Sequence, residues 1–326
     1  MYPLGKQFEV DYSKAKNDNK AMVVGRKYRI TVITERVVRL EYSPTGTFVD
    51  IPSQLVKNRN FGLPEFTIRQ DNNFLEITTK YFTLSYMKEQ PFIGSKIDPM
   101  KNLKITLKSV TDKDKQRDWY YGHPEIRNMK GNIVGVDVPI GDNLARGLYS
   151  LEGFASFNDS NTKLLDRDGT LLDRASGNID IYVFMYGIDF NLALNDYFKI
   201  TGFPELLPRY ALGNWWCRNT NYNDDRLDDL LLKFDKKKIP ISVLLLDKDW
   251  HYRNVGDYKD LRTGFTFNNE LFPNPAETIK RVHLRNIRVG LQVNPTEGFY
   301  PHDQFYQKAR EYLGVMSDQI IKFDPL

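Results

Sequence analysis

One change of hydrophobic pattern, close to Phe190, constrains the fold of this 326-residue chain more than any other feature. Before it, short runs rich in Val, Ile, Thr, Tyr and Phe are separated by clusters of Asn, Gly, Asp and Pro. This arrangement is typical of an all-β sandwich, because β-branched and aromatic side chains suit strands and the intervening residues suit turns. We expect strands at residues 27–34, 37–42, 66–69, 74–79, 82–86, 103–107 and 181–186.

After Phe190, helical and strand-like patterns alternate. Apolar residues of 194–201 recur at helical spacing, and Gly202 can end that helix in a left-handed conformation. Pro204 and Pro208 then stop any helix and mark a boundary. These signals divide the chain into a β-sandwich domain at residues 1–188, a linker helix at 189–203 and an α/β region at 204–326.

Three strand-like runs follow this boundary. Residues 211–218 form the first, and residues 289–293 form the third, in which apolar and polar or small side chains alternate. Residues 241–246 are continuously apolar, as a strand covered on both faces requires. Parallel strands need long connections, and the spacing of these runs leaves room for one helix between each pair.

Two amphipathic helices are predicted in those connections. Asn223 or Asp224 can cap the first, whose leucines at 227–234 form one stripe. Asn274 followed by Pro275 can begin the second. The order βαβαβ argues for a parallel sheet with right-handed crossovers.

The composition excludes several classes of protein. Aromatic residues make up 13% of the chain and charged residues 27%, which is not the composition of a disordered protein. A net charge of +4 with mixed signs gives little reason to expect a nucleic-acid partner. The single cysteine rules out a disulfide framework, and the four histidines lack zinc-ligand spacing, so we expect no metal and no cofactor.

Two further features concern the membrane. The sequence contains no run of about 18 apolar residues, which a spanning helix would need. Its first residues lack the apolar core of a secretory signal. We therefore expect no membrane partner and a cytoplasmic location.

Asp247, Asp249 and Trp250 form the strongest local signal for chemistry. They follow the apolar run at 241–246, at the carboxyl end of a predicted parallel strand, where α/β folds bind ligands. Carboxylates two residues apart on a strand point to one side and can accept hydrogen bonds from sugar hydroxyls, while an indole ring can cover the apolar face of a pyranose. The alternative is that the acids cap the following turn and that Trp250 belongs to the core.

Polar residues also end the other two predicted strands. Gln292 and Asn294 share one side of the third strand, where they either line a ligand site or satisfy each other as buried amides. Arg218 ends the first strand and is either the partner of a carboxylate or a substrate contact. Cys217 beside it is expected to be a small buried hydrophobe, because the sequence places no histidine next to it.

Several segments are similar, in order, to one known family. They read RLEYS at 39–43, NMKG at 128–131, TGFPELLPRYALG at 201–213, LDKDWH at 246–251, FTFN at 265–268, FPNP at 272–275 and VGLQVNP at 289–295. Together they resemble glycoside hydrolase family 31, the family of α-glucosidases and α-xylosidases. The resemblance extends over essentially the whole chain, and its specificity comes from the shared order of the segments.

The resemblance implies a retaining α-glycosidase in which a galactose-mutarotase-like β-sandwich precedes a (β/α)8 TIM barrel. It implies that Asp247 binds a hydroxyl of the sugar at the cleavage subsite and that Gln292 and Asn294 line this subsite. Asn219 matches an aromatic position near the subsite in other members. Glu152 falls near a loop of the β-domain that reaches over the pocket, where the family often has an Arg-Asp or Arg-Ser pair.

The same resemblance implies that the catalytic carboxylates lie beyond Leu326. The family's nucleophilic aspartate is on the fourth barrel strand and its acid/base aspartate is later still, whereas residues 204–326 show three strands and about half of the roughly 250 residues of a barrel. We therefore expect no catalytic residue in this chain and no activity from it alone. The expected partners are an α-linked sugar and either a second chain that completes the barrel or another copy of this chain.

We interpret the chain as the N-terminal part of an α-glucosidase that acts on small α-glucosides. It would then be a truncated product, a fragment completed by a second chain, or a sugar-binding module without chemistry. Two alternatives remain. One is an α-xylosidase or α-galactosidase of the same family, and the other is a carbohydrate-binding or structural protein in which the β-sandwich is the working part.

Overall fold

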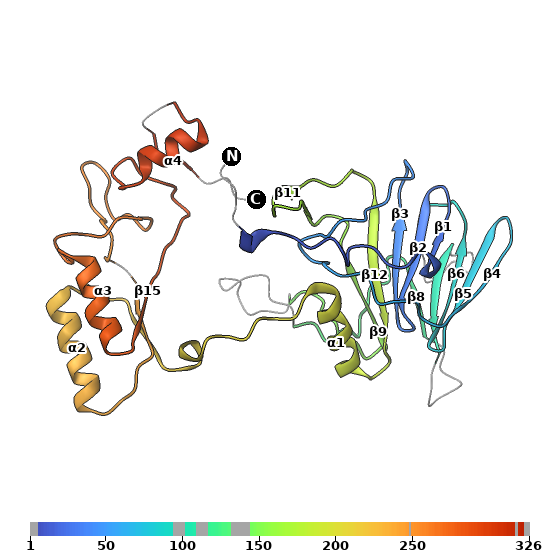
Figure 1. Cartoon of the computed structure of the whole chain (residues 1–326), viewed down its shortest axis with the longest axis horizontal. Helices are drawn as coiled ribbons and strands as arrows, with labels where there is room; N and C mark the ends of the chain where they lie inside the picture. Colours follow the sequence, from blue (N-terminus) through green and yellow to red (C-terminus); the bar gives the residue numbers. More distant parts are fainter. Residues whose placement is uncertain are drawn as a thin grey trace. The chain divides into compact units, whose positions relative to one another are not determined.

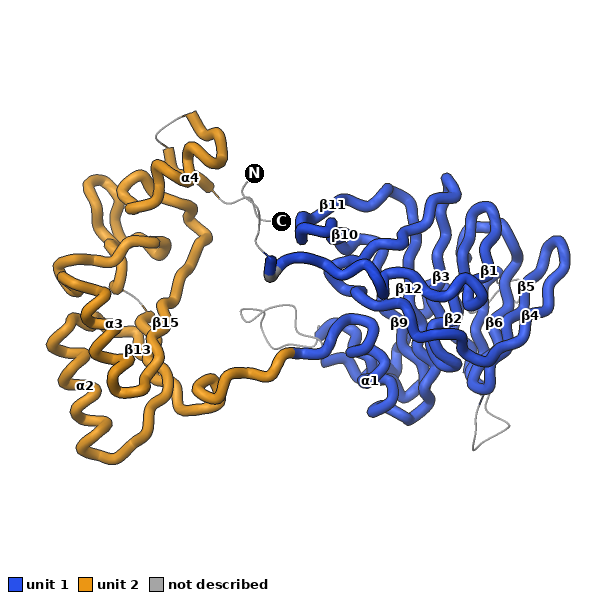
Figure 2. The backbone as a smooth tube through the Cα atoms, in the orientation of Figure 1, with its two compact units in different colours: residues 1–204 blue, residues 205–326 orange. Residues whose placement is uncertain are grey.

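The computed structural model describes residues 6–93, 102–108, 117–131, 144–247, 249–316 and 319–322. The chain divides into two compact units, residues 1–204 and residues 205–326, which Figure 2 shows in blue and orange. Each unit has its own cluster of buried apolar side chains, so each is described by itself.

The first unit contains two five-stranded antiparallel sheets (Figure 1). One sheet has the order β1-β2-β3-β12-β9, with bounds Met22–Val24, Tyr28–Thr34, Val37–Tyr42, Ile179–Met185 and Phe154–Asn158. The other has the order β4-β5-β6-β7-β8, with bounds Thr67–Gln70, Phe74–Thr78, Phe82–Met87, Leu103–Leu107 and Arg117–Tyr120. A hairpin of β10 (Leu164–Leu165) and β11 (Leu171–Leu172) and the short helices η1 (Lys6–Phe8) and η2 (Asn19–Ala21) complete the described elements before α1.

The strands expected in this unit are confirmed, with bounds that shift by no more than two residues. In the second unit the strand expected at 211–218 begins only at Trp215, because Arg209–Leu212 form a short 3-10 helix. The pattern missed β1, β8 and β9, as well as the β10-β11 hairpin. These strands are short or carry polar residues, as in Arg117–Tyr120, so they lack the alternation on which the prediction depended.

One apolar core lies between the two sheets. Ile30 and Leu40 enter it from the first sheet, and Ile77 and Leu84 enter it from the second, all of them fully buried. Burial of this apolar surface is the main force that holds two such sheets face to face.

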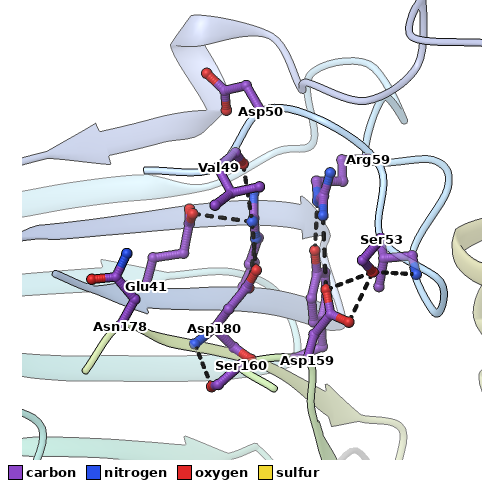
Figure 3. Close-up of polar contacts among 12 residues, drawn as sticks. Glu41, Val49, Asp50, Ser53, Arg59, Asp159, Ser160, Asn178 and Asp180 are labelled. Atoms are coloured by element: carbon purple, nitrogen blue, oxygen red, sulfur yellow. Dashed lines mark hydrogen bonds and ion pairs between the residues drawn. The ribbon is translucent and has the colours of Figure 1, made fainter. Parts of the chain in front are cut away.

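The opposite face of the first sheet carries charged side chains that are themselves buried (Figure 3). Arg39 on β3 donates two hydrogen bonds to Asp180 on β12, at 2.8 and 2.7 Å. Arg29 on β2 donates two to Glu41 on β3, at 2.6 and 2.8 Å. Because Tyr28 to Ile33 are all buried, β2 lacks the solvent-exposed face that an antiparallel strand often has.

Irregular segments are fastened to this charged face by further polar contacts. Ser53 donates to both oxygens of Asp159 at 2.8 and 2.9 Å, and Arg174 donates to Asp159 at 2.7 Å. Arg59, also drawn in Figure 3, donates to the hydroxyl of Tyr182 at 2.7 Å. The segments around Ser53 and Arg174 are thus held on the sheet by charge and hydrogen bonds.

Helix α1, Phe190–Thr201, ends the first unit and confirms the helix expected there. Its buried residues Ala193 and Ile200 pack with Phe184 and Tyr186. The helix ends at Gly202, whose φ of +106° is one that residues with a Cβ rarely adopt.

The second unit has the predicted βαβαβ order. Strands β13 (Trp215–Arg218), β14 (Val243–Leu246) and β15 (Arg288–Leu291) form a parallel sheet with β14 at its centre. Helix α2 (Asp224–Lys236) connects β13 to β14, and α3 (Pro275–Leu284) lies between β14 and β15. The short helix η3 (Arg209–Leu212) precedes the sheet, and α4 (Tyr306–Leu313), which the sequence pattern missed, follows it.

The two helix starts follow from asparagine caps. The side chain of Asn223 accepts a hydrogen bond from the backbone N–H of Arg226 at 3.0 Å, so Asn223 is the cap of α2 and Asp224 is its first residue. Asn274 accepts one from the N–H of Glu277 at 3.3 Å and precedes the first residue of α3, Pro275. Both caps satisfy N–H groups that the helix itself leaves unpaired.

Only one face of the described β13-β14-β15 sheet packs against helices. Leu244 and Leu246 of the central strand belong to the same buried cluster as Leu227 and Leu231 of α2 and Val282 of α3. This cluster forms the core of the second unit. None of the helices in the described ranges combines the length and apolarity needed to cross a lipid bilayer.

Candidate functional site

The carboxyl ends of the three parallel strands are in register. Cys217, Leu245 and Gly290 are paired across the sheet, and so are Arg218, Leu246 and Leu291. The N–H of the next residue, Gln292, donates to the carbonyl of Leu246 at 2.9 Å, which carries the register one residue past the strands. Asn219, Asp247 and Gln292 are therefore the first residues after the three aligned strand ends.

The sheet face opposite the helices carries Cys217 and Asp247. Cys217 is exposed, so the expectation of a buried cysteine is wrong. In the described residues the helices cover the face of Leu244 and Leu246, while the alternate face carries the buried Val243 and the exposed Cys217. Desolvation and, second, the carboxylate of Asp247 raise the pKa of the Cys217 thiol.

The two acids after β14 have different environments. Asp247 is half-buried and makes no hydrogen bond or ion pair with any other residue in the described ranges. Asp249 accepts an ion-pair hydrogen bond from Arg253 at 3.3 Å, and its φ is +62°. The strand ends at Leu246 and the φ of Asp249 is positive, so strand alternation does not extend over the two acids, and their common side stays a prediction.

Trp250 belongs to the core of the second unit, with a side chain that is nearly inaccessible to solvent. Its ring lies edge-on to Phe267 and to His251, with centroid distances of 5.1 and 5.3 Å. Its indole N–H donates to the carbonyl of Gln292 at 2.9 Å. The ring therefore offers no free face to a sugar, and the alternative of a core tryptophan holds.

The amides after β15 also differ from each other. Gln292 is exposed, and its contacts in the described structure are made by its backbone. The side chain of Asn294 accepts hydrogen bonds from the N–H and the hydroxyl of Thr296, at 3.1 and 2.8 Å. Asn294 thus caps a turn, and the expectation that the two amides might satisfy each other is wrong.

Three further candidate residues end or precede strands. Arg218, the last residue of β13, and Asn219 after it are exposed, and their side chains have no hydrogen-bond partner within the described part of the chain. Glu152 lies in the first unit, just before β9, and its buried Oε2 likewise has no partner there. The structure brings Arg218, Asn219, Asp247 and Gln292 to one sheet edge, while Glu152 stands in the other unit.

Two acids that the sequence did not single out join the loops after β14 and β15. Glu297 accepts hydrogen bonds from the N–H groups of Arg262 and Thr263, at 2.8 and 3.1 Å. Asp303 accepts from the N–H of Phe265 at 2.9 Å and is itself buried. The sequence around Glu297 and Asp303 does not indicate these roles, because each acceptor lies more than 30 residues from its donor.

The chemistry of this edge is that of hydrogen bonding to a polyol. Asp247 offers a carboxylate without a partner. Gln292 and Asn219 offer amides, and Arg218 offers a guanidinium that is always charged and has several donors. Within the described ranges, no three His, Cys, Asp or Glu side chains are placed to hold a metal ion. The edge can thus accept hydroxyl hydrogens at Asp247 and donate to hydroxyl oxygens at its neighbours.

Comparison with known proteins places the second unit in a defined family. Residues 204–322 match the profile described as the Glycosyl hydrolases family 31 TIM-barrel domain. Over 273 residues the chain is 29% identical to an alpha-xylosidase of Saccharolobus solfataricus, an alignment that covers 79% of this chain and 34% of the relative. Over 147 residues it is 31% identical to alpha-glucosidase 2 of Bacillus thermoamyloliquefaciens, covering 45% of this chain and 17% of the relative.

A solved structure shares the fold over most of the chain. The family 31 dextranase of Flavobacterium johnsoniae, complexed with isomaltotriose, superposes with a TM-score of 0.57 at 18% identity, covering 88% of this chain and 38% of that one. This chain spans about a third or less of the length of the two curated relatives named above.

Proposed function

We infer that this chain, which belongs to glycosyl hydrolase family 31, supplies part of the sugar-binding site of a retaining α-glycosidase that acts on small α-glucosides. The family is one of glycoside hydrolases, and its named relatives include an alpha-glucosidase and alpha-xylosidases. The proposed site is the edge formed by Arg218, Asn219, Asp247 and Gln292.

The observation that carries this proposal is the environment of Asp247. Its carboxylate is half-buried at the carboxyl end of the central strand and lacks a partner in the described structure. A partly desolvated acceptor without a donor is costly, and hydrogen bonds from two sugar hydroxyls would satisfy it. Asp249, one turn further on, already has Arg253 as its partner and is less suited to that role.

In this proposal some of the neighbouring residues contact the sugar and others hold the turns beside it. Gln292 and Asn219 would donate or accept at adjacent hydroxyls, and Arg218 would bind from the β13 side. Asp249 and Asn294 would act through the turns that they hold. Glu152 lies in the first unit, and its contact with the sugar stays a prediction from the family resemblance alone.

The catalytic step requires residues other than these. Retaining hydrolysis needs two carboxyl groups about 5 Å apart, one as nucleophile and one as acid and base. The family resemblance assigns both to barrel strands that follow the third. We therefore propose that β13, β14 and β15 bind the sugar and that the catalytic pair is supplied by other strands.

A second candidate substrate is an α-xyloside. It is favoured by one observation, the alignment over 79% of this chain with a relative named alpha-xylosidase. The two sugars differ by the exocyclic CH2OH group of glucose. Comparing methyl α-glucoside with methyl α-xyloside in the experiment below distinguishes them.

The single cysteine makes the proposed site directly testable. Alkylation of Cys217 at pH 8 is followed by mass spectrometry with increasing concentrations of each methyl glycoside. We expect the bound sugar to slow alkylation, because Cys217 is paired across the sheet with Leu245, two residues before Asp247. Asp247→Asn should raise the sugar concentration for half-protection at least about tenfold, since a hydrogen bond to a charged group contributes about 1.5–3 kcal/mol.

The control is Asp229→Asn, which neutralises an exposed acid on α2. Protection is expressed relative to each variant's own rate without sugar, because Asp247 itself raises the pKa of the thiol. If neither glycoside protects Cys217, or if Asp247→Asn is protected as well as Asp229→Asn, the proposed site is wrong.

A further inference from the structure

We propose that Trp250 is a positioning residue, whose indole N–H sets the place of Gln292 beside Asp247 in the sugar site. This inference rests on the proposed function. The ring of Trp250 is enclosed in the core and cannot stack on the sugar, so its role in the site is to hold a neighbouring residue in place.

The backbone of Gln292 is held on both sides by the β14 segment. Its N–H donates to the carbonyl of Leu246, the last residue of β14, at 2.9 Å. Its carbonyl accepts from the indole of Trp250, four residues further along the chain, at 2.9 Å. Gln292 lies just past the end of β15, where ordinary sheet pairing no longer constrains it. Two hydrogen bonds with one neighbouring segment thus hold the two peptide groups that flank Gln292.

Trp250 is suited to this role because it is itself immobile. Its carbonyl accepts a hydrogen bond from the N–H of Asn268 at 2.8 Å. Its ring is clamped edge-on by Phe267 and His251. A donor held in this way transmits its position to the acceptor, so the exposed amide of Gln292 and the carboxylate of Asp247 keep a fixed relation.

The chain contains a matched control for this role. Trp216 packs against the same buried cluster as Trp250, and its indole also donates one hydrogen bond, to the hydroxyl of Tyr222 at 3.0 Å. That acceptor precedes α2. Replacing either tryptophan by phenylalanine removes one indole N–H and part of a ring from the same core. Because Trp250 is buried and Trp216 only partly buried, a difference reports the acceptor where it is confined to residues 291–294.

The test uses the full chain as Trp250→Phe and Trp216→Phe. Amide hydrogen exchange over residues 291–294 is measured without sugar, and half-protection of Cys217 is measured with methyl α-glucoside and methyl α-xyloside. We expect Trp250→Phe to exchange about fivefold faster than Trp216→Phe over 291–294, and to need about fivefold more sugar, as loss of one neutral hydrogen bond implies. Circular dichroism confirms that both variants remain folded.

The outcomes separate this inference from the function on which it rests. Equal exchange in the two variants would overturn the anchoring of Gln292 by Trp250. Suppose that sugar protects Cys217 in the wild type, and that Trp250→Phe exchanges faster over 291–294 but needs no more sugar for half-protection. The hydrogen bond would then be a structural contact only, and the positioning role would be overturned. If no sugar protects even the wild type, the proposed function fails, while faster exchange in Trp250→Phe still supports the anchor. Should Trp250→Phe not fold, exchange of the Trp250 indole N–H is measured in the wild type, where its hydrogen bond to the Gln292 carbonyl should slow it, and exchange as fast as that of a free indole would overturn the anchor.

Discussion

At the residue scale, burial separates charges that bind from charges that hold the fold. Arg39 and Asp180 are almost fully buried, and each satisfies the other with two hydrogen bonds. Burial alone would raise the pKa of Asp180, but the charge and hydrogen bonds of Arg39 and the charges of Arg59 and Arg174 together outweigh it, so the pKa falls from 3.8 to about 2. Asp247, in contrast, is half-buried and has no such partner among the described residues. A carboxylate with this environment is available to a ligand.

Asp180→Ala should destabilise the first unit by about 3–5 kcal/mol, because it removes both hydrogen bonds between Asp180 and the buried Arg39 and leaves Glu41 as the ion-pair partner of Arg39. Asp173→Ala is the control, since Asp173 forms an exposed pair with Lys163 and should change stability by less than about 1 kcal/mol. Urea unfolding followed by circular dichroism measures both. A similar loss in the two variants would mean that the buried pair adds nothing beyond surface charge.

The lowered pKa of Asp180 also predicts a dependence on pH. An acid whose pKa is lower in the folded state contributes stability that is complete above the pKa of the unfolded chain and is lost as the pH falls through the folded value. The unfolding free energy of the wild type should therefore fall between about pH 4 and pH 2. Asp180→Asn should show a smaller fall over that range in the same titration.

At the element scale, the starts of the helices follow from side chains that cap them. The cap of α3 is Asn274, which satisfies the N–H of Glu277 next to a proline at the first helical position. The ends of the strands matter as much, because β14 ends at Leu246 and leaves Asp247 at the sheet edge.

Asn274→Ala should destabilise the second unit by about 1 kcal/mol, since alanine cannot accept the hydrogen bond. Asn274→Ser retains an acceptor and should stay within a few tenths of the wild type. Thermal unfolding followed through the tryptophans of the second unit provides the comparison. If serine is as destabilising as alanine, the contribution of Asn274 is packing and not capping.

At the scale of the whole molecule, the chain consists of two compact units with separate cores. The charged layer belongs to the first unit and the parallel sheet to the second. In the described structure β13 and β15 form the two edges of that sheet, and one sheet face is open. The sugar-binding groups and the catalytic pair are thus proposed to come from different strands of one barrel.

The purified 326-residue chain should therefore show no hydrolysis of aryl α-glucosides or aryl α-xylosides, because the proposed site holds one carboxylate without a partner where retention needs two. Release of nitrophenol above the buffer rate is the measurement. Turnover that disappears in Asp247→Asn and persists in Asp229→Asn would contradict this prediction and place the catalytic group among residues 1–326.

Much of the fold could be predicted because its signals are local. The run at 241–246 is apolar whatever surrounds it, and Asn274 with Pro275 begins a helix through contacts within one turn. The site was predicted less well. Trp250 next to two acids has the same sequence whether its ring faces a sugar or the core, and Cys217 has the same sequence whether it is buried or exposed.

The sequence by itself determined the order of the longer elements, the boundary near Pro204 and the end of β14 that leaves Asp247 at the sheet edge. Period and capping act over a few residues, so the chain needs no tertiary context to express them. Only the tertiary structure decided which polar groups remain free. The partners of Arg39 and of Trp250 lie 141 and 42 residues away, and pairing at such separations depends on how the sheets assemble.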